Sequence, residues 1–387
     1  MLLELTKSEE AILDGSKGEV HALAYRVLLA IGQATEAEKL VPIQWAHISG
    51  VNYNTIGDAG VNFLKEVSNN VRFRVRTSIN PMGYDSHQPN RLPQTFRSKQ
   101  MQIVESYKKM GAMQSFSCTP YEIFRLPRKG TSVSFAESSA AVFSNSFLGL
   151  MTNKESALSA LASAITGKSP YSDLRIQKSR IPKVALKCRD VPIRTETDHG
   201  LLGYVAGKIA KDSCIAFSDL RSEMEMIHAK AISSGLGTSG SSGMFTSDDE
   251  AASETVEIDE NEVSRAKDEL STDEDGDVIL FGSPQLGLSE LTYLHDLAAG
   301  RKFDRRCIIF CSRYVHDQAR KIGLASRIES TGAEFMCDSC MCLSPLITRD
   351  TTDSIITNSV KGAYYMNSSN RVGVSLKDMK SIVRDYS

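Results

Sequence analysis

The sequence lacks an excess of charge of either sign: 45 Lys and Arg residues face 47 Asp and Glu residues, a formal net charge of −2 over 387 residues. A chain this close to neutral has no electrostatic attraction to nucleic acid or to an anionic membrane. The sequence also lacks any uncharged apolar stretch of about 18 residues, the length that a membrane-spanning helix needs. We therefore expect neither nucleic acid nor a membrane as a partner.

Residues 1–7 have neither the basic region nor the apolar core of a signal peptide. We therefore expect a cytoplasmic protein, in which the eight cysteines are reduced and their thiols are free or bind metal. The seven histidines show no spacing typical of a zinc site or a catalytic triad, and we assign none of them a role.

The cysteines occur in different sequence environments, some beside apolar strands and others in loops. Cys307 and Cys311 flank an apolar strand and are predicted to be core thiols. The C-x-x-C within Cys337–Cys342 is weak evidence for zinc, because the sequence has no second pair of this kind. Three thiolates that converge from distant loops would suit an iron–sulfur cluster with one open iron, which can act as a Lewis acid on a hydroxyl group. Cys118 and Cys340 could supply two of them.

The length of the chain exceeds what one ordinary core can support, and predicts two or three domains. We place an N-terminal α/β region with the candidate substrate loops at residues 1–190. A C-terminal α/β region at residues 191–387 carries Ser283, Cys340 and Lys361.

The order of elements predicts an α/β fold. Residues 6–40 are expected to be helical, with Thr6 and Glu9 as a capping box at the start and an end of the helix near Gly32 or soon after. Three apolar segments alternate with predicted helices, at 278–281, 307–310 and 333–336. This alternation is typical of parallel sheets with helices on both faces, in which ligands bind beyond the carboxyl ends of the strands.

Polar side chains interrupt the small, apolar run Ala136–Ser146, which follows Cys118 by less than twenty residues. Such groups are not buried without partners, so we interpret the run as the floor of an active site. Glu137 either faces a ligand or pairs with a buried Arg or Lys. Lys361 is a point charge in a loop of small residues. The segment at 50–60 is either an anion site at a helix N-terminus or a tight turn.

Eleven pieces of the sequence, taken in order, resemble the large subunit of the aconitase X family. They are Leu5-Thr6, Gly50-Val51 with 56–60, Asn80-Pro81, 118–121, 136–140, Asn145-Ser146, Thr152-Asn153, 158–166, 202–204, 338–340 with Ser344-Pro345, and 357–359 with Lys361. The resemblance implies an aconitase-like multidomain fold and removal of water from a hydroxy acid.

The resemblance also implies a cofactor and a binding site. It implies an iron–sulfur cluster, expected in the [4Fe–4S] form, held by Cys118 and Cys340. It implies a substrate pocket for a small anionic substrate, lined by Gly50, Val51, Asn52, Asn80, Pro81, Glu137 and Ser138, with Lys361 reaching the substrate. Elimination of a hydroxyl group needs its developing charge neutralised and a base at the adjacent carbon.

Within the family, residues 49–60 resemble the archaeal branch, which dehydrates (R)-5-phosphomevalonate to trans-anhydromevalonate 5-phosphate in an alternative mevalonate pathway. This branch implies a heterodimer with a small, swivelling-domain subunit. That subunit is expected to provide a serine as the base, so no catalytic base is assigned within this chain. The other branch dehydrates cis-3-hydroxy-L-proline.

The sequence departs from the family pattern at the expected site. Where the family has Gly-Cys-Pro-His, which supplies a cluster ligand, this chain has Gly282-Ser283-Pro284-Gln285, and Met151 replaces an arginine. The cluster could therefore be absent, differently ligated or reduced to a simpler metal site, and Cys337 or Cys342 could compensate. Besides dehydration of either substrate, a non-catalytic binding or scaffold subunit remains an alternative.

Overall fold

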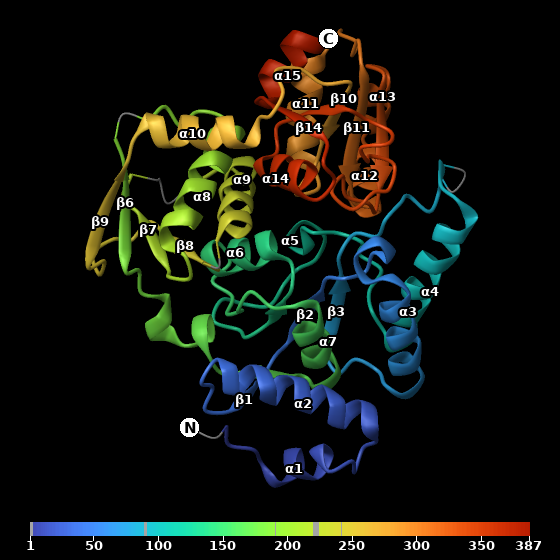
Figure 1. Ribbon diagram of the computed structural model, residues 1–387, viewed down its shortest axis with the longest axis vertical. Coiled ribbons are helices and arrows are strands. Elements are labelled where there is room, and N and C mark those ends of the chain that lie inside the picture. The colour runs from blue at the N-terminus through green and yellow to red at the C-terminus, as the bar shows by residue number, and fades with distance from the viewer. Residues whose placement is uncertain (1–2, 89–90, 190, 220–223, 241) are drawn as a thin grey trace.

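In the computed structural model, which describes residues 3–88, 91–189, 191–219, 224–240 and 242–387, three parallel β-sheets and one antiparallel ribbon organise the fold. Helices pack against the sheets, and the N- and C-terminal regions lie at opposite ends of the molecule (Figure 1). The predicted α/β class with parallel sheets is confirmed. None of the helices in the described ranges is both long enough and apolar enough to cross a membrane.

The first sheet has the order β3-β2-β4. Its strands are β2 (Trp45–Ile48), β3 (Arg76–Ile79) and β4 (Ser134–Phe135). The main helices of this region are α2 (Glu19–Ala34), α3 (Tyr53–Asn70), α4 (Gln94–Met110), α6 (Ser138–Ser146) and α7 (Ala157–Thr166). A buried apolar cluster joins α2, α3, α4 and α7 to the sheet, so the loops after the strands start from a rigid base.

The helix expected from Thr6 ends close to the expected position, at Ala34, but it is wrong as one continuous helix. The chain forms α1 (Lys7–Leu13), with the predicted capping box between Thr6 and Glu9, and then α2. Between them Gly15 and Gly18 adopt φ values of 97° and 85°, which are not helical and which glycine adopts without steric cost. After α2, strand β1 (Leu40–Pro42) pairs with β5 (Lys168–Pro170) as the antiparallel ribbon.

The second sheet has the order β8-β7-β6-β9. Its strands are β6 (Val184–Cys188), β7 (Ile215–Phe217), β8 (Phe245–Thr246) and β9 (Glu254–Ile258), with helices α8 (Glu196–Ala210), α9 (Met226–Ser239) and α10 (Glu260–Leu270). Helices α8 and α9 pack so closely that a Cβ atom on Gly203 would lie 2.3 Å from the Ile232 carbonyl oxygen. Glycine is therefore required at this crossing.

The third sheet has the order β12-β11-β10-β13-β14. Its strands are β10 (Val278–Phe281), β11 (Arg306–Cys311), β12 (Ala333–Cys337), β13 (Ser354–Thr357) and β14 (Gly373–Leu376). Its helices are α11 (Leu288–Ala298), α12 (Arg313–Lys321), α13 (Leu324–Glu329), α14 (Val360–Ser368) and α15 (Met379–Tyr386).

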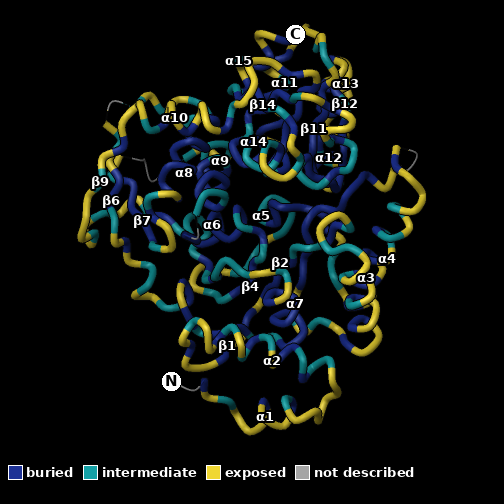
Figure 2. Tube along the Cα trace, viewed as in Figure 1, coloured by how far each residue is buried: buried dark blue, intermediate teal, exposed yellow. Residues whose placement is uncertain are grey.

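Both faces of the third sheet are covered. Along β11, Cys307, Ile309 and Cys311 belong to one apolar cluster, whereas Ile308 and Phe310 belong to another. Alternate residues of a strand point to opposite faces, so the two clusters lie on the two sides of the sheet. Figure 2 shows these strands buried, in contrast to the exposed stretches along α1 and α10. Cys307 and Cys311 are confirmed as core thiols.

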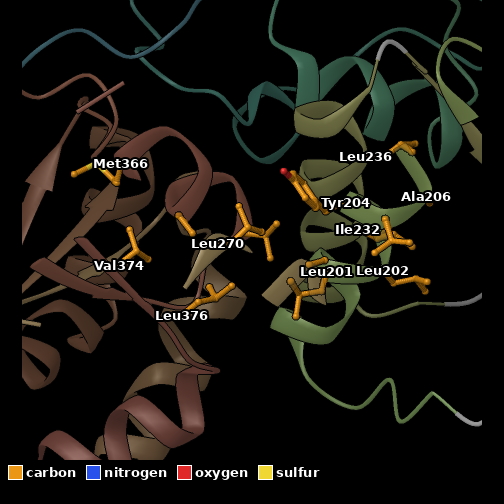
Figure 3. Packing of buried hydrophobic residues seen from close by; sticks show 14 of the residues in the cluster. Leu201, Leu202, Tyr204, Ala206, Ile232, Leu236, Leu270, Met366, Val374 and Leu376 are labelled. Carbon is orange, nitrogen blue, oxygen red and sulfur yellow. The ribbon is translucent and has the colours of Figure 1, made fainter. Parts of the chain in front are cut away.

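One apolar cluster continues from the second sheet to the third. Leu202 on α8 and Ile232 on α9 belong to the same cluster as Val374 and Leu376 on β14 (Figure 3). The division expected at residue 190 stays a prediction. That residue lies outside the described residues, and β6 before it belongs to the same sheet as β7 to β9 after it.

A buried ammonium group joins the three sheet regions. Lys230 on α9 is 2% exposed, and its Nζ atom donates to Glu122 at 2.9 Å, to the Gln285 carbonyl oxygen at 2.8 Å and to Glu290 on α11. Glu122 lies on the short helix α5 (Pro120–Ile123), directly after Cys118. Burial raises the pKa of the Glu290 carboxyl group to about 7, although the positive charge of Lys230 acts to lower it.

We expect Lys230→Met to lower the free energy of unfolding by roughly 3–5 kcal/mol, because it leaves two buried carboxyl groups without their counter-charge. Lys208→Met is the matched control, since Lys208 pairs with Glu269 at the surface, and such a pair contributes about 1 kcal/mol or less. Urea unfolding of both variants measures the difference. Equal losses in the two variants would contradict a bridging role for Lys230.

Candidate active site

The loops that follow the parallel strands meet around one cavity of about 840 Å³. Loops after β2, β3 and β4 form one side, and loops after β10, β12 and β13 form the other. This is the position that an open parallel α/β sheet offers to a ligand.

Every residue that the sequence analysis assigned to substrate or cluster binding lies on the wall of this cavity, whereas Met151 and Gln285 do not line it. The residues on the wall are Gly50, Val51, Asn52, Asn80, Pro81, Cys118, Glu137, Ser138, Ser283, Cys340 and Lys361. The structure thus brings together segments more than 300 positions apart in the sequence. Their individual roles in binding stay predictions.

The segment after β2 forms a helix start that is tied to the opposite wall. Asn52 caps α3 by accepting a hydrogen bond from the Asn54 backbone N–H at 2.7 Å. Its side-chain amide donates to the Leu343 carbonyl oxygen at 3.1 Å. Gly50 has a φ of 73°, which suits glycine at this turn. The Asn52 side chain therefore fixes the two walls relative to each other.

Glu137 and Lys361 form an ion pair at the floor of the cavity. Lys361 Nζ contacts Glu137 Oε1 and donates to Ser139 Oγ at 3.0 Å. Burial alone would raise the pKa of Glu137, but the charge and hydrogen bond of Lys361 lower it below its usual value. Burial opposes the charge of Lys361, yet Glu137 raises the pKa of the ammonium. The interpretation of Glu137 as the partner of a buried lysine is confirmed. Glu137 also lines the cavity, and contact with a ligand stays a prediction.

A chain of hydrogen bonds through Asn80 and His47 orients the Glu137 carboxylate. Asn80 Nδ2 donates to Glu137 Oε2 at 3.0 Å, and Asn80 Oδ1 lies 2.7 Å from His47 Nε2. Burial lowers the pKa of His47 to about 4, so the ring is neutral at physiological pH. Its Nε2–H therefore donates to Asn80, and its Nδ1 accepts from the Ser78 hydroxyl at 2.8 Å.

Three cysteine sulfur atoms lie on the wall of the same cavity. Cys118, Cys340 and Cys342 line the cavity together with Ser283. Ser283 Oγ lies 3.4 Å from Cys342 Sγ and 3.8 Å from Cys340 Sγ. Cys118 Sγ accepts the Gln285 backbone N–H at 3.2 Å.

This donor set fits an iron–sulfur cluster. Thiolates are the ligands that such clusters select. Among the described residues, no three His, Cys, Asp or Glu side chains form a group that could hold one metal ion. In a cluster each cysteine sulfur binds a different iron, so the sulfurs need not converge on one ion.

Sequence reasoning missed several cavity residues. Tyr365 and Ser369 follow Lys361 at intervals of four, a spacing that places side chains on one face of a helix and could have revealed them. His47 was assigned no role, because neither its spacing nor its neighbours in the sequence mark it. Arg349, which lies exposed at the cavity, carried no signal.

The second half of the run 136–146 has a structural role. Asn145 accepts a hydrogen bond from the Thr152 backbone N–H at 3.0 Å and donates to the Gly243 carbonyl oxygen at 2.9 Å. It thereby ties α6 to the second sheet region. Ala136, Glu137 and Ser138 are the members of this run that line the cavity.

Comparisons with known proteins agree with this arrangement. A family model described as the aconitase X first domain matches residues 2–178, and one described as the aconitase X third domain matches residues 276–386. The second sheet lies between the two matches. A crystal structure of Thermococcus kodakaraensis aconitase X in its holo-form superposes with a TM-score of 0.91, at 32% identity, over 100% of both chains.

Relatives of known activity fall into two groups. The phosphomevalonate dehydratase large subunits of Aeropyrum pernix and Methanocaldococcus jannaschii are 34% and 33% identical, and cover 94% and 98% of this chain and 94% and 99% of their own. The cis-3-hydroxy-L-proline dehydratase of Pseudomonas aeruginosa is 29% identical, over 92% of this chain and 65% of its own.

The buried His47 predicts a specific loss of stability in acid. The unfolded chain takes up a proton on this ring below pH 6.5, whereas the folded chain resists protonation to about pH 4. Stability therefore falls as the pH drops between these values, by up to about 3 kcal/mol from this residue. We expect His47→Gln to lose correspondingly less stability over this range. Urea unfolding from pH 7 to 4 tests this, and parallel curves for both proteins would contradict it.

Proposed function

The chain belongs to the aconitase X family of hydro-lyases, and we propose that it is the large subunit of a phosphomevalonate dehydratase. The reaction would convert (R)-5-phosphomevalonate to trans-anhydromevalonate 5-phosphate in an alternative mevalonate pathway. The observation that carries the proposal is the higher sequence identity to the phosphomevalonate dehydratase large subunits, 34% and 33%, compared with 29% to the hydroxyproline dehydratase.

The charges of the cavity support a substrate with two anionic groups. Lys361 lies at the floor and Arg349 at an exposed position on the wall. An ammonium has three N–H donors, and two of those on Lys361 are directed to Glu137 and Ser139. The remaining donor suits a substrate carboxylate. The guanidinium of Arg349 suits a phosphate, which it can bind with two parallel hydrogen bonds.

The residues of this chain orient the substrate and would hold the cofactor. Cys118 and Cys340 would ligate an iron–sulfur cluster, whose exposed iron acts, when bound, as a Lewis acid toward the departing hydroxyl group. Asn80 and His47 hold the Glu137 carboxylate in place, so that the ion pair with Lys361 is preorganised. The [4Fe–4S] form stays a prediction, which counting of iron and sulfide would check.

A second subunit is part of the proposal. The relatives are described as large subunits, which implies a small one. We propose that this small subunit has the swivelling-domain fold and supplies the catalytic base, for which this chain assigns no residue. The cytoplasmic location likewise stays a prediction.

Dehydration of cis-3-hydroxy-L-proline is the second candidate. It is favoured by the relatives at 29% identity and by Asp350, whose carboxylate lines the cavity and would suit the substrate ammonium. The non-catalytic scaffold suggested by Ser283 and Met151 is the remaining alternative.

The test is turnover by the chain co-expressed with its small subunit and purified without oxygen. We expect phosphomevalonate to be dehydrated with a kcat/KM at least about a hundredfold above that for cis-3-hydroxy-L-proline, because a site built for a phosphate leaves polar groups unpaired without one. Preference for hydroxyproline would replace the proposal with the second candidate. A complex that contains iron and sulfide but turns over neither substrate would support the scaffold.

Arg349→Gln is expected to raise KM for phosphomevalonate by about 10- to 100-fold with little change in kcat, because a hydrogen bond to a charged group is lost away from the reacting atoms. Arg327→Gln is the control, since Arg327 is an exposed arginine on α13 that does not line the cavity. Steady-state kinetics separate the two parameters. An unchanged KM in the Arg349 variant would remove this residue from the phosphate site.

A further inference from the structure

We propose that Cys342 provides the third thiolate of the cluster site, beside Cys118 and Cys340, and that Ser283 donates a hydrogen bond to a ligand sulfur instead of binding iron. The presence of a cluster rests on the proposed function. The new statement concerns which side chains of this chain hold it.

The geometry places the Cys342 sulfur next to the side chain of position 283. Ser283 is 2% exposed, and its Oγ lies 3.4 Å from Cys342 Sγ and 3.8 Å from Cys340 Sγ. All three side chains line the same cavity as Cys118. Position 283 provides no sulfur ligand. Cys342 can provide one, because its sulfur is in van der Waals contact with the Ser283 side chain.

The chemistry assigns different roles to the hydroxyl and the thiols. A serine hydroxyl keeps its proton at neutral pH and is a poor ligand for iron compared with a thiolate. Each cysteine thiol releases one proton to solvent when it binds the metal, and no electron transfer is needed. The bound sulfur can then only accept a hydrogen bond, so the Ser283 hydroxyl donates it. Such bonds tune the reduction potential of a cluster.

Gln285 ties the two cysteine-bearing loops to the loop of Ser283. Its backbone N–H donates to Cys118 Sγ at 3.2 Å, and its side-chain amide donates to the carbonyl oxygens of Phe116 at 3.2 Å and Ser339 at 2.9 Å. The loop of Cys118 and the loop of Cys340 and Cys342 are thus fixed to the loop of Ser283. A site whose ligands are held by such outer hydrogen bonds is preorganised for metal.

Two buried polar atoms belong to residues of the loops that carry Cys340 and Ser283. The Ser339 hydroxyl and the Gln285 side-chain oxygen have no hydrogen-bond partner among the described residues. Buried polar atoms are rarely left unpaired, and each such case requires an explanation. Ser339 immediately precedes Cys340 in the chain, and Gln285 follows Ser283 by two residues.

The experiment measures iron, acid-labile sulfide, visible absorption and electron paramagnetic resonance of the full chain, co-expressed with its small subunit and reconstituted without oxygen. We expect Cys342→Ala to lower iron and sulfide by at least about tenfold, because even the outer partners of metal ligands contribute this much to affinity. Cys337→Ala, from the same C-x-x-C segment but outside the cavity, is the matched control and should retain the wild-type content.

Variants at position 283 separate a ligand from a hydrogen-bond donor. Ser283→Ala should keep its iron and sulfide and show a shifted resonance spectrum. The double variant Ser283→Cys with Cys342→Ala should regain the iron lost by Cys342→Ala alone, because it returns a sulfur to the neighbouring position. This rescue excludes misfolding as the cause of the loss.

Three results would overturn the assignment: wild-type iron and sulfide in Cys342→Ala, equal losses in Ser283→Ala and Cys342→Ala, or no iron in the reconstituted wild-type chain. The proposed substrate is tested separately. If the wild-type complex contains iron and sulfide but does not dehydrate phosphomevalonate, the proposed function fails and the ligand assignment stands on the cluster data.

Discussion

The buried ammonium of Lys230 is the interaction on which the arrangement of the three sheet regions depends. It reaches Glu122 beside the Cys118 loop, and Gln285 and Glu290 beside the Ser283 loop, from a helix of the second sheet. A charge at this depth is tolerated only when its partners are held in place, so the ion pairs and the sheet positions require each other. The sulfur wall of the cavity is assembled at the same junction.

The ion pair at the floor of the cavity also joins charged groups from different sheet regions. Lys361 comes from the third sheet region and Glu137 from the first, and the pair remains charged because each group favours the ionised form of the other. Behind it, the neutral ring of His47 sets the direction of the Asn80 amide. The pair therefore offers a substrate fixed donors and acceptors, which do not reorganise during a reaction.

The substitutions that separate this chain from its family pattern are connected in space. Ser283 and Gln285 lie on one loop, and both contact the segments that carry cysteines. A serine at position 283 alone would leave a cluster site short of a sulfur. The sulfur of Cys342 lies against that serine. In the proposed site, the thiolate that position 283 lacks is therefore supplied by position 342. The distinction matters because soft donors, and not their exact sequence positions, determine which metal centre can form.

The sequence by itself determined the α/β class, the core thiols at 307 and 311, the capping box at Thr6, and part of the set of residues that line the cavity, because local patterns and a family resemblance carry this information. It did not establish that the predicted helix divides at Gly15 and Gly18: glycine has a low helix propensity, but the apolar spacing on both sides of this segment suits a helix. Only the tertiary structure decided that Glu137 pairs with Lys361, that His47 supports Asn80, and that Cys342 lies beside Ser283. These contacts join residues 33 to 224 positions apart, and their partners are chosen by the packing of three sheets, which no local pattern records.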